Sequence, residues 1–265
     1  PQIEYLNNRL KDSKLSFSHR TSVHVHMNIL EHTYEEILNT IYIYLLIEEP
    51  MMNYCGRERK GNRFCLRVQD ADGITDMLHS IFSSDLKVFR NIKNDMMRYA
   101  SINLEALNKY GSLEFRGMRG TVDPDIISNW VAAIKRIRDF AIEFKNPMEI
   151  YEYYSKTSSR EFVEQVLKEV APSFIYSRLD RDMQKSFSLS IDLPYAYVNT
   201  ADLREAELCC HPVRSAGERA VRSREGRLHR RRPPPHRQVR AVLRRHALPR
   251  RDRRHDAPDA DEDPP

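Results

Sequence analysis

The segment TSVHVHMNIL, residues 21–30, decides the fold that we expect for this chain. Its side chains alternate in character: Val23, Val25, Met27 and Ile29 are apolar, and Ser22, His24, His26 and Asn28 are polar. This period of two predicts a half-buried β-strand. Successive side chains of a strand point to opposite faces, so both histidines point to the polar face. Other strands of the same sheet can contribute further polar side chains to that face.

Three more segments show the same alternation, at residues 63–68, 99–104 and 112–116. Each has one apolar side and one polar side, which predicts four strands of one sheet with a single buried face. The polar sides carry His24, His26, Asn28, Arg63, Arg67, Tyr99, Asn103, Glu114 and Arg116.

Helical signals lie between these strands. Thr33 and Glu36 form a capping box that opens a helix, and Pro50 is expected to end it. A short helix is predicted near residues 73–84. Asp123 followed by Pro124 begins a long amphipathic helix. Residues 148–185 are expected to form two or three further helices.

This order predicts an α+β fold in which helices pack on one face of an antiparallel or mixed sheet. We divide the chain into an α+β core at residues 1–146, a helical extension at 147–203 and a tail at 204–265. No internal repeat is visible.

The tail differs sharply in composition from the rest. Residues 1–203 hold 26 Lys and Arg against 28 Asp and Glu, a net charge of −2, whereas residues 204–265 hold 17 Arg and 10 acidic residues, a net charge of +7. The tail has no aromatic residue after Arg204, so it is expected to be disordered. Its use of residues with GC-rich codons indicates translation in a shifted reading frame. The alternative is a basic arm that binds nucleic acid.

No secretion signal or membrane span is predicted, because the longest apolar run, Ile41–Ile47, is short. The four cysteines form no Cys-x-x-Cys pair. We therefore expect a reduced, cytoplasmic protein. The sequence also lacks the Gly-x-Gly-x-x-Gly, His-Glu-x-x-His, Gly-x-Ser-x-Gly and Walker A patterns.

Two pairs of residues indicate chemistry on the polar face. His24 and His26 can approach one cation, although single histidines on a solvated strand are common. Glu114 and Arg116 are spaced as an ordinary ion pair, but beside the histidines they suit a metal-phosphate site. There the carboxylate would hold Mg²⁺ and the guanidinium a phosphoryl or carboxylate group. Arg119 could reach the same place.

The ordered set SVHVHMNI, GNRFC, RYASINLEAL and GSLEFRGMRGTVDPDIISNWVAAI resembles the amidoligase family, relatives of glutamine synthetase and glutamate–cysteine ligase found in phages and bacterial operons. The match covers roughly residues 15–145. The resemblance implies a glutamine synthetase-like catalytic domain that uses ATP and Mg²⁺ to join a carboxylate to an amine. It implies that His24 and Glu114 hold metal and that His26 contacts nucleotide phosphate or metal. Arg116 would bind the phosphoryl or carboxylate group, and Arg63 would line the ATP side. Further candidates for nucleotide binding are Arg119, Arg67 and Asn103.

The chain departs from the family pattern before residue 15. Family members begin with a Glu-x-Glu strand and an Asp-Gly-Ser segment, which supply further metal ligands, and neither occurs here. We therefore interpret the chain as a truncated copy with weak or no activity. The expected partners are a small-molecule or peptide carboxylate and an amine, with no membrane. Two alternatives are a non-catalytic nucleic-acid-binding protein acting through the Arg-rich tail and an inactive α+β fragment. The oligomeric state is left open.

Overall fold

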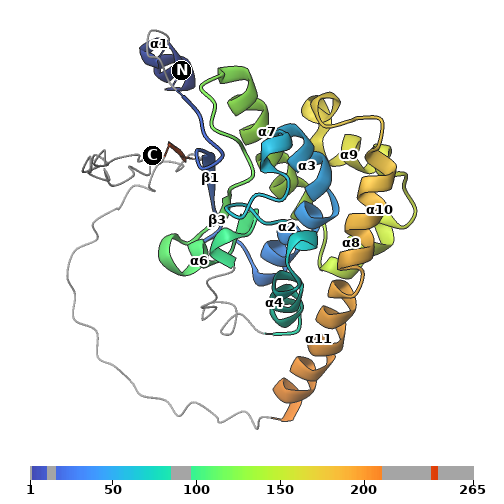
Figure 1. Cartoon of the computed structure of the whole chain (residues 1–265). Helices are drawn as coiled ribbons and strands as arrows, with labels where there is room; N and C mark the ends of the chain where they lie inside the picture. Colours follow the sequence, from blue (N-terminus) through green and yellow to red (C-terminus); the bar gives the residue numbers. More distant parts are fainter. Residues whose placement is uncertain (1, 11–15, 85–96, 211–239, 244–265) are drawn as a thin grey trace, which may run out of the picture.

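The computed structural model describes residues 2–10, 16–84, 97–210 and 240–243 (Figure 1). Its strands are β1 (Val23–Asn28), β2 (Ile102–Asn103), β3 (Ser112–Phe115) and β4 (Arg240–Leu243). They form one sheet in the order β2-β3-β1-β4, and every pair is antiparallel. The predicted α+β fold with an antiparallel sheet is therefore confirmed.

The α-helices are α1 (Gln2–Leu10), α2 (Tyr34–Leu46), α3 (Glu48–Cys55), α4 (Asp72–Phe82), α6 (Glu105–Tyr110), α7 (Pro124–Ala141), α8 (Pro147–Tyr154), α9 (Ser159–Leu167), α10 (Leu179–Ser190) and α11 (Leu193–Cys210). Short 3-10 helices are η1 (Arg57–Arg59), η2 (Val68–Asp70), η3 (Met97–Tyr99) and η4 (Lys168–Ser173). In Figure 1 the sheet lies on the left, α2, α3 and α7 lie beside it, and α8, α9 and α10 form the outer layer on the right.

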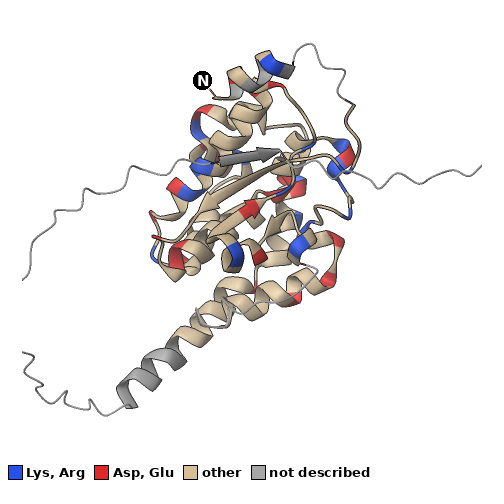
Figure 2. Cartoon of the chain, turned by 90° about the vertical axis from the view of Figure 1, so that its left-hand side faces the viewer, with Lys and Arg blue, Asp and Glu red and all other residues tan. Residues whose placement is uncertain are grey.

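One face of the sheet packs against this helical layer. Val23, Val25 and Met27 of β1 are buried there, and Phe115 of β3 meets the ring of Tyr44 from α2 edge to face. Figure 2 shows the other face turned toward the viewer, with the helices behind it. The polar positions of β1 and β3 belong to that second face, as their alternation requires.

The predicted helix starts are present. Thr33 caps α2 through the expected capping box with Glu36, and Asp123 accepts hydrogen bonds from the backbone N–H groups of Asp125 and Ile126 at the start of α7. The expectation that Pro50 ends the first helix is wrong, because the break falls at Ile47 and Pro50 lies in the first turn of α3. A proline is tolerated there, since the first N–H groups of a helix have no partner within it.

The strand predicted at residues 63–68 is largely wrong. Only Leu66 forms a bridge, parallel to Ala100, and the segment then turns into η2. The turn is stabilised because the Asp70 carboxylate accepts from both the backbone and the guanidinium of Arg67. Such local side-chain bonds compete with strand pairing. The strand predicted at 99–104 is shortened to β2.

The boundary that we placed at residue 203 does not coincide with the end of an element. Helix α11 continues to Cys210, and residues 240–243 form β4 beside β1. An edge strand offers unpaired backbone groups, so even a short segment can add to it. The disorder predicted for the rest of the tail lies outside the described residues. Within the described ranges, every helix is too short or too polar to span a lipid bilayer.

Candidate functional site

The strand register places three of the predicted site residues in one row across the sheet. His26 of β1 is opposite Glu114 of β3, and Glu114 is opposite Asn103 of β2. Directly opposed residues of antiparallel strands share a face. The row therefore lies on the face turned away from the helices, with His24 and Arg116 flanking it.

Glu114 is the centre of this cluster. Its Oε1 lies 2.7 Å from His24 Nδ1 and 3.5 Å from His26 Nε2. Its Oε2 accepts a hydrogen bond of 2.6 Å from Asn103 Nδ2, and Arg116 Nη1 lies 3.4 Å from both oxygens. We call these five residues, His24, His26, Asn103, Glu114 and Arg116, the carboxylate cluster.

The two histidines differ in their surroundings. His24 is buried, and its Nε2 lies 2.7 Å from the Ser22 hydroxyl. Its Nδ1 lies 2.7 Å from Glu114 Oε1, a contact that opposes the lowering of the His24 pKa by burial. His26 is less buried, and its Nδ1 lies 3.0 Å from the Ser112 hydroxyl. His26 is thus the histidine that a bound molecule can reach more easily.

The charges of the cluster follow from these contacts. Burial opposes ionisation of Glu114, but the histidines and Arg116 outweigh it and hold the pKa of this carboxyl well below its usual range. Burial lowers the pKa of His24, and the nearby Arg116 adds to this, although Glu114 acts in the opposite direction. At neutral pH the cluster therefore presents an ionised carboxylate beside a neutral imidazole.

Arg59, which the sequence analysis did not single out, supports the segment that carries Arg116. It is 1% exposed, and its guanidinium donates to three carbonyls: Gly117 at 2.8 Å, Arg116 at 2.8 Å and His19 at 3.2 Å. At Gly117 a Cβ would lie 2.9 Å from Met52 Sδ, so a larger residue would require the Met52 side chain to shift. The position of Arg116 therefore depends on Arg59 and Gly117. These contacts cannot be recognised in the sequence, because Arg59 and Gly117 are 58 residues apart. Ser22 and Ser112 could have been found, because they occupy polar positions of the same strands.

Three predicted arginines lie outside the carboxylate cluster. Arg67 pairs with Glu49 at 2.8 Å and with Asp70 at 2.7 Å. Arg119 donates to the Tyr54 and Cys55 carbonyls at the end of α3, 3.1 Å away in each case. Arg63 is exposed, and its guanidinium lies over the Phe64 ring.

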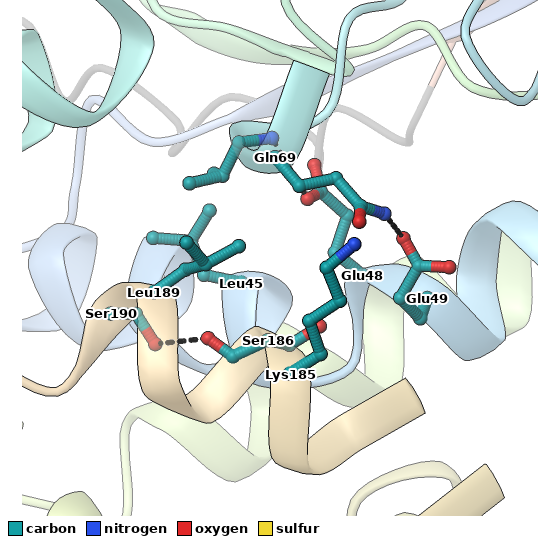
Figure 3. A pocket seen from close by; sticks show the side chains of 9 residues that line it. Leu45, Glu48, Glu49, Gln69, Lys185, Ser186, Leu189 and Ser190 are labelled. Atoms are coloured by element: carbon teal, nitrogen blue, oxygen red, sulfur yellow. Dashed lines mark hydrogen bonds between the residues drawn. The ribbon is translucent and has the colours of Figure 1, made fainter. Parts of the chain in front are cut away.

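A second buried carboxylate, Glu48, lies at the junction of α2 and α3. It accepts from the Ser101 hydroxyl at 2.5 Å and from the Val68 N–H at 3.0 Å. Burial raises its pKa to about 8. Glu48 lines a cavity with Glu49, Gln69 and Lys185, in which the Lys185 side chain reaches over from α10 (Figure 3). The cavity has room for about one water molecule, so it cannot hold a nucleotide.

The metal-binding capacity of the described residues is limited. No group of three or more His, Cys, Asp and Glu side chains suited to an ion occurs among them. The carboxylate cluster offers the Glu114 carboxylate with the His24 imidazole beside it. A protein site for Mg²⁺ can consist of one or two carboxylates, with waters and substrate phosphates filling the remaining positions. The cluster fits a cation of that kind.

Fold and site together define a class: an α+β protein with an ionised glutamate, two histidines and an arginine on the sheet face opposite the main helical layer. Residues 1–137, more than half of the 265-residue chain, match the family model described as "Putative amidoligase enzyme". The chain therefore belongs to this amidoligase family, whose description names a ligase role. No curated protein and no solved structure matches the chain.

Proposed function

We propose that this chain is an ATP- and Mg²⁺-dependent ligase that joins a carboxylate to an amine through an acyl phosphate. The support is the family membership together with the carboxylate cluster. The cluster combines a fixed negative charge, which attracts a cation, with a guanidinium, which binds phosphoryl or carboxylate groups.

The chemistry explains why both charges are needed. A carboxylate does not react with an amine unaided, because its oxygen is a poor leaving group. In the first step a substrate carboxylate oxygen attacks the γ-phosphorus of ATP, the bond to the β-phosphate oxygen breaks, and ADP leaves. In the second step the amine attacks the acyl carbon, inorganic phosphate leaves, and the nitrogen loses a proton. Phosphoryl transfer of this type depends mainly on positioning and charge stabilisation.

Each residue of the carboxylate cluster has a role in the proposed reaction. Arg116 binds the carboxylate or the transferring phosphoryl group, since its guanidinium can donate two parallel hydrogen bonds. Glu114 and His24 are the candidates for holding Mg²⁺, which when bound would neutralise phosphate charge. His26, the more accessible histidine, contacts a phosphate oxygen. Asn103 fixes the Glu114 carboxylate through its 2.6 Å hydrogen bond. Arg63, Arg67 and Arg119 have no contact with the cluster that supports a role in it.

The observation that carries the proposal is that Glu114 is buried yet ionised, with His24, His26 and Arg116 all within 3.5 Å of its oxygens. Strongly shifted pKa values with a specific set of partners are typical of functional sites.

The test is Mg²⁺-dependent binding of ATP to the full chain, followed as a rise in melting temperature. A ligand that binds only the folded state stabilises it, by about 2.7 kcal/mol at a hundredfold excess over its Kd. We expect a rise with Mg²⁺ and ATP together, little with either alone, and none in Glu114→Gln. Each variant is compared with its own ligand-free melting temperature, so that a change in intrinsic stability does not enter.

The matched control is Glu169→Gln. Glu169 is an exposed carboxylate that pairs with Arg136, far from the sheet in sequence and on another element. It should keep the full response. If Mg²⁺-ATP stabilises Glu114→Gln as much as the unchanged protein, the carboxylate cluster is not the nucleotide site and the proposal is wrong.

A further inference from the structure

Three exposed arginines surround two aromatic rings beside the carboxylate cluster. The guanidinium carbons of Arg63 and Arg20 lie 5.0 Å and 6.0 Å from the centre of the Phe64 ring, and that of Arg98 lies 6.0 Å from the centre of the Tyr99 ring. The two rings meet edge to face at 6.3 Å. We call Arg20, Arg63, Arg98, Phe64 and Tyr99 the arginine platform.

Backbone contacts hold the three segments of the platform together. The His19 carbonyl accepts from Asn62 Nδ2 at 2.8 Å and from Arg59 at 3.2 Å. The Leu66 N–H donates to the Tyr99 carbonyl at 2.7 Å. Residues 19–20, 62–64 and 98–99 are therefore fixed relative to one another, and the arginines project from a rigid base.

The charges of the platform are not neutralised within the described part of the chain. Arg20, Arg63 and Arg98 are exposed and have no carboxylate partner there, whereas Arg67, Arg119 and Arg136 each have one. Residues 1–203 carry a net charge of −2, from 26 basic and 28 acidic residues. Three such arginines around one pair of rings make a local concentration of positive charge, which attracts an anionic partner.

The geometry favours carboxylates over nucleic-acid bases. Proteins that bind single strands use free aromatic faces on which bases stack. Here guanidinium groups lie over the rings of both Phe64 and Tyr99. Stacking on a ring leaves the N–H edges of an arginine free, and these edges match a carboxylate with two hydrogen bonds.

The platform also adjoins the carboxylate cluster. Arg116 Nε lies 3.4 Å from the carbonyl of Phe64, and Arg116 Nη1 lies 3.4 Å from Glu114. A chain of carboxylates bound on the platform would therefore have one of its members next to Arg116. We propose that the arginine platform binds an acidic peptide and presents one of its carboxylates to Arg116. The second half of this inference rests on the proposed ligase function, and the binding itself does not.

The test uses fluorescein-labelled hexaglutamate and the full chain, with affinity followed by fluorescence anisotropy in the absence of ATP. We expect the triple variant Arg20→Gln, Arg63→Gln, Arg98→Gln to bind about tenfold more weakly, as expected when several charge-assisted hydrogen bonds are lost. All three side chains are exposed, so the variant should fold, which circular dichroism checks.

The control is a second triple variant, Arg160→Gln, Arg178→Gln, Arg181→Gln, which removes the same charge from exposed arginines in the region of α9 and α10. Both triples keep the Arg-rich residues 204–265, so any binding by that segment is equal in them. If both triple variants lose affinity equally, the arginine platform is not the binding site of the peptide and the proposal is wrong. Labelled hexathymidylate serves as the other probe. If the platform triple loses as much affinity for hexathymidylate as for hexaglutamate, the partner is a single-stranded nucleic acid and not an acidic peptide.

Failure of this inference differs from failure of the ligase proposal. Hexaglutamate binding needs neither ATP nor Mg²⁺, so the two kinds of binding are measured independently on the unchanged protein. Loss of Mg²⁺-ATP binding with intact peptide binding would refute the ligase alone. Intact Mg²⁺-ATP binding with equal affinities in the two triples would refute the platform alone.

Discussion

Glu114 and Glu48 are buried to nearly the same extent, with 6% and 4% of their surface exposed, yet their pKa values move in opposite directions. Glu114 has two histidines, an asparagine and an arginine around it, and its pKa falls. Glu48 has a hydroxyl and one backbone N–H, and its pKa rises to about 8. Burial alone therefore does not decide the charge of a carboxylate; the number and charge of its partners do.

The comparison separates a carboxylate that can act on a ligand from one that serves the fold. The lowered pKa of Glu114 keeps this carboxyl ionised at neutral pH, as the proposed role in binding a cation requires. Glu48 is mainly protonated at neutral pH and joins α3 to η2 and to the segment before β2 through its hydrogen bonds.

Replacement of Glu114 by glutamine should have the largest effect. It removes the charge that faces Arg116 and the histidines, and loss of one partner of a buried ion pair typically costs about 3 kcal/mol. Because the pKa of Glu114 is lowered in the folded state, its stabilisation is present above the ordinary carboxyl pKa and is lost as the pH falls below it. Urea unfolding should therefore show a large difference between the two proteins at pH 7 and a smaller one at pH 4. A difference that does not depend on pH would contradict the assignment of an ionised Glu114.

Replacement of Glu48 by glutamine should change the pH dependence of the free energy of unfolding in the opposite sense. A carboxyl whose pKa is raised on folding stabilises the protein fully below its ordinary pKa, and this stability is lost as the pH rises through about 8. The unchanged protein should lose up to about 1.4 kcal/mol per pH unit across that window relative to the variant. Glutamine keeps a carbonyl oxygen for Val68, and the Ser101 hydroxyl can rotate to accept from its amide. Urea unfolding between pH 5 and pH 9 measures the difference, and parallel curves for the two proteins would show that Glu48 is ionised.

Removal of one neutral hydrogen-bond donor from each carboxylate should have the smallest effect. Asn103→Ala deletes the donor to Glu114, and Ser101→Ala deletes the donor to Glu48. Each should cost about 1–2 kcal/mol. The informative readout is the pH profile: Asn103→Ala should change only the acidic limb, and Ser101→Ala only the limb near pH 8. A variant that moved both limbs would mean that the two carboxylates are coupled.

The parts of this molecule that sequence could predict are those set by near neighbours. The alternation around His24 and around Glu114 is a local property, and the buried row of Val23, Val25 and Met27 confirms it. The caps at Thr33 and Asp123 involve contacts three residues away at most. These local patterns place His24, His26, Asn103 and Glu114 on polar faces, whereas the strand order that groups them was expected from the family resemblance.

Features that depend on distant contacts could not be predicted. Glu48 and Ser101 are 53 residues apart, and nothing near either one announces their hydrogen bond. Residues 63–68 alternate like a strand, yet the contact of Arg67 with Asp70 and Glu49 turns the chain into η2. The sheet face on which we placed Arg63 and Arg67 is therefore not formed, since only Leu66 bridges to Ala100 in this segment. Their charge was identified correctly, but their position was not.

Arg59 has a consequence for the order in which this protein folds. Its guanidinium joins the η1 turn to carbonyls 40, 57 and 58 residues away along the chain. Contacts between distant residues form only after the intervening loops have closed, and loop closure costs entropy. The segment that holds Arg116 therefore reaches its final position late, after the capped helices α2 and α7 have formed. During refolding, amide protons around Arg116 and Gly117 should become protected from exchange after those of α7, and the site should gain its shape only in the last folding step.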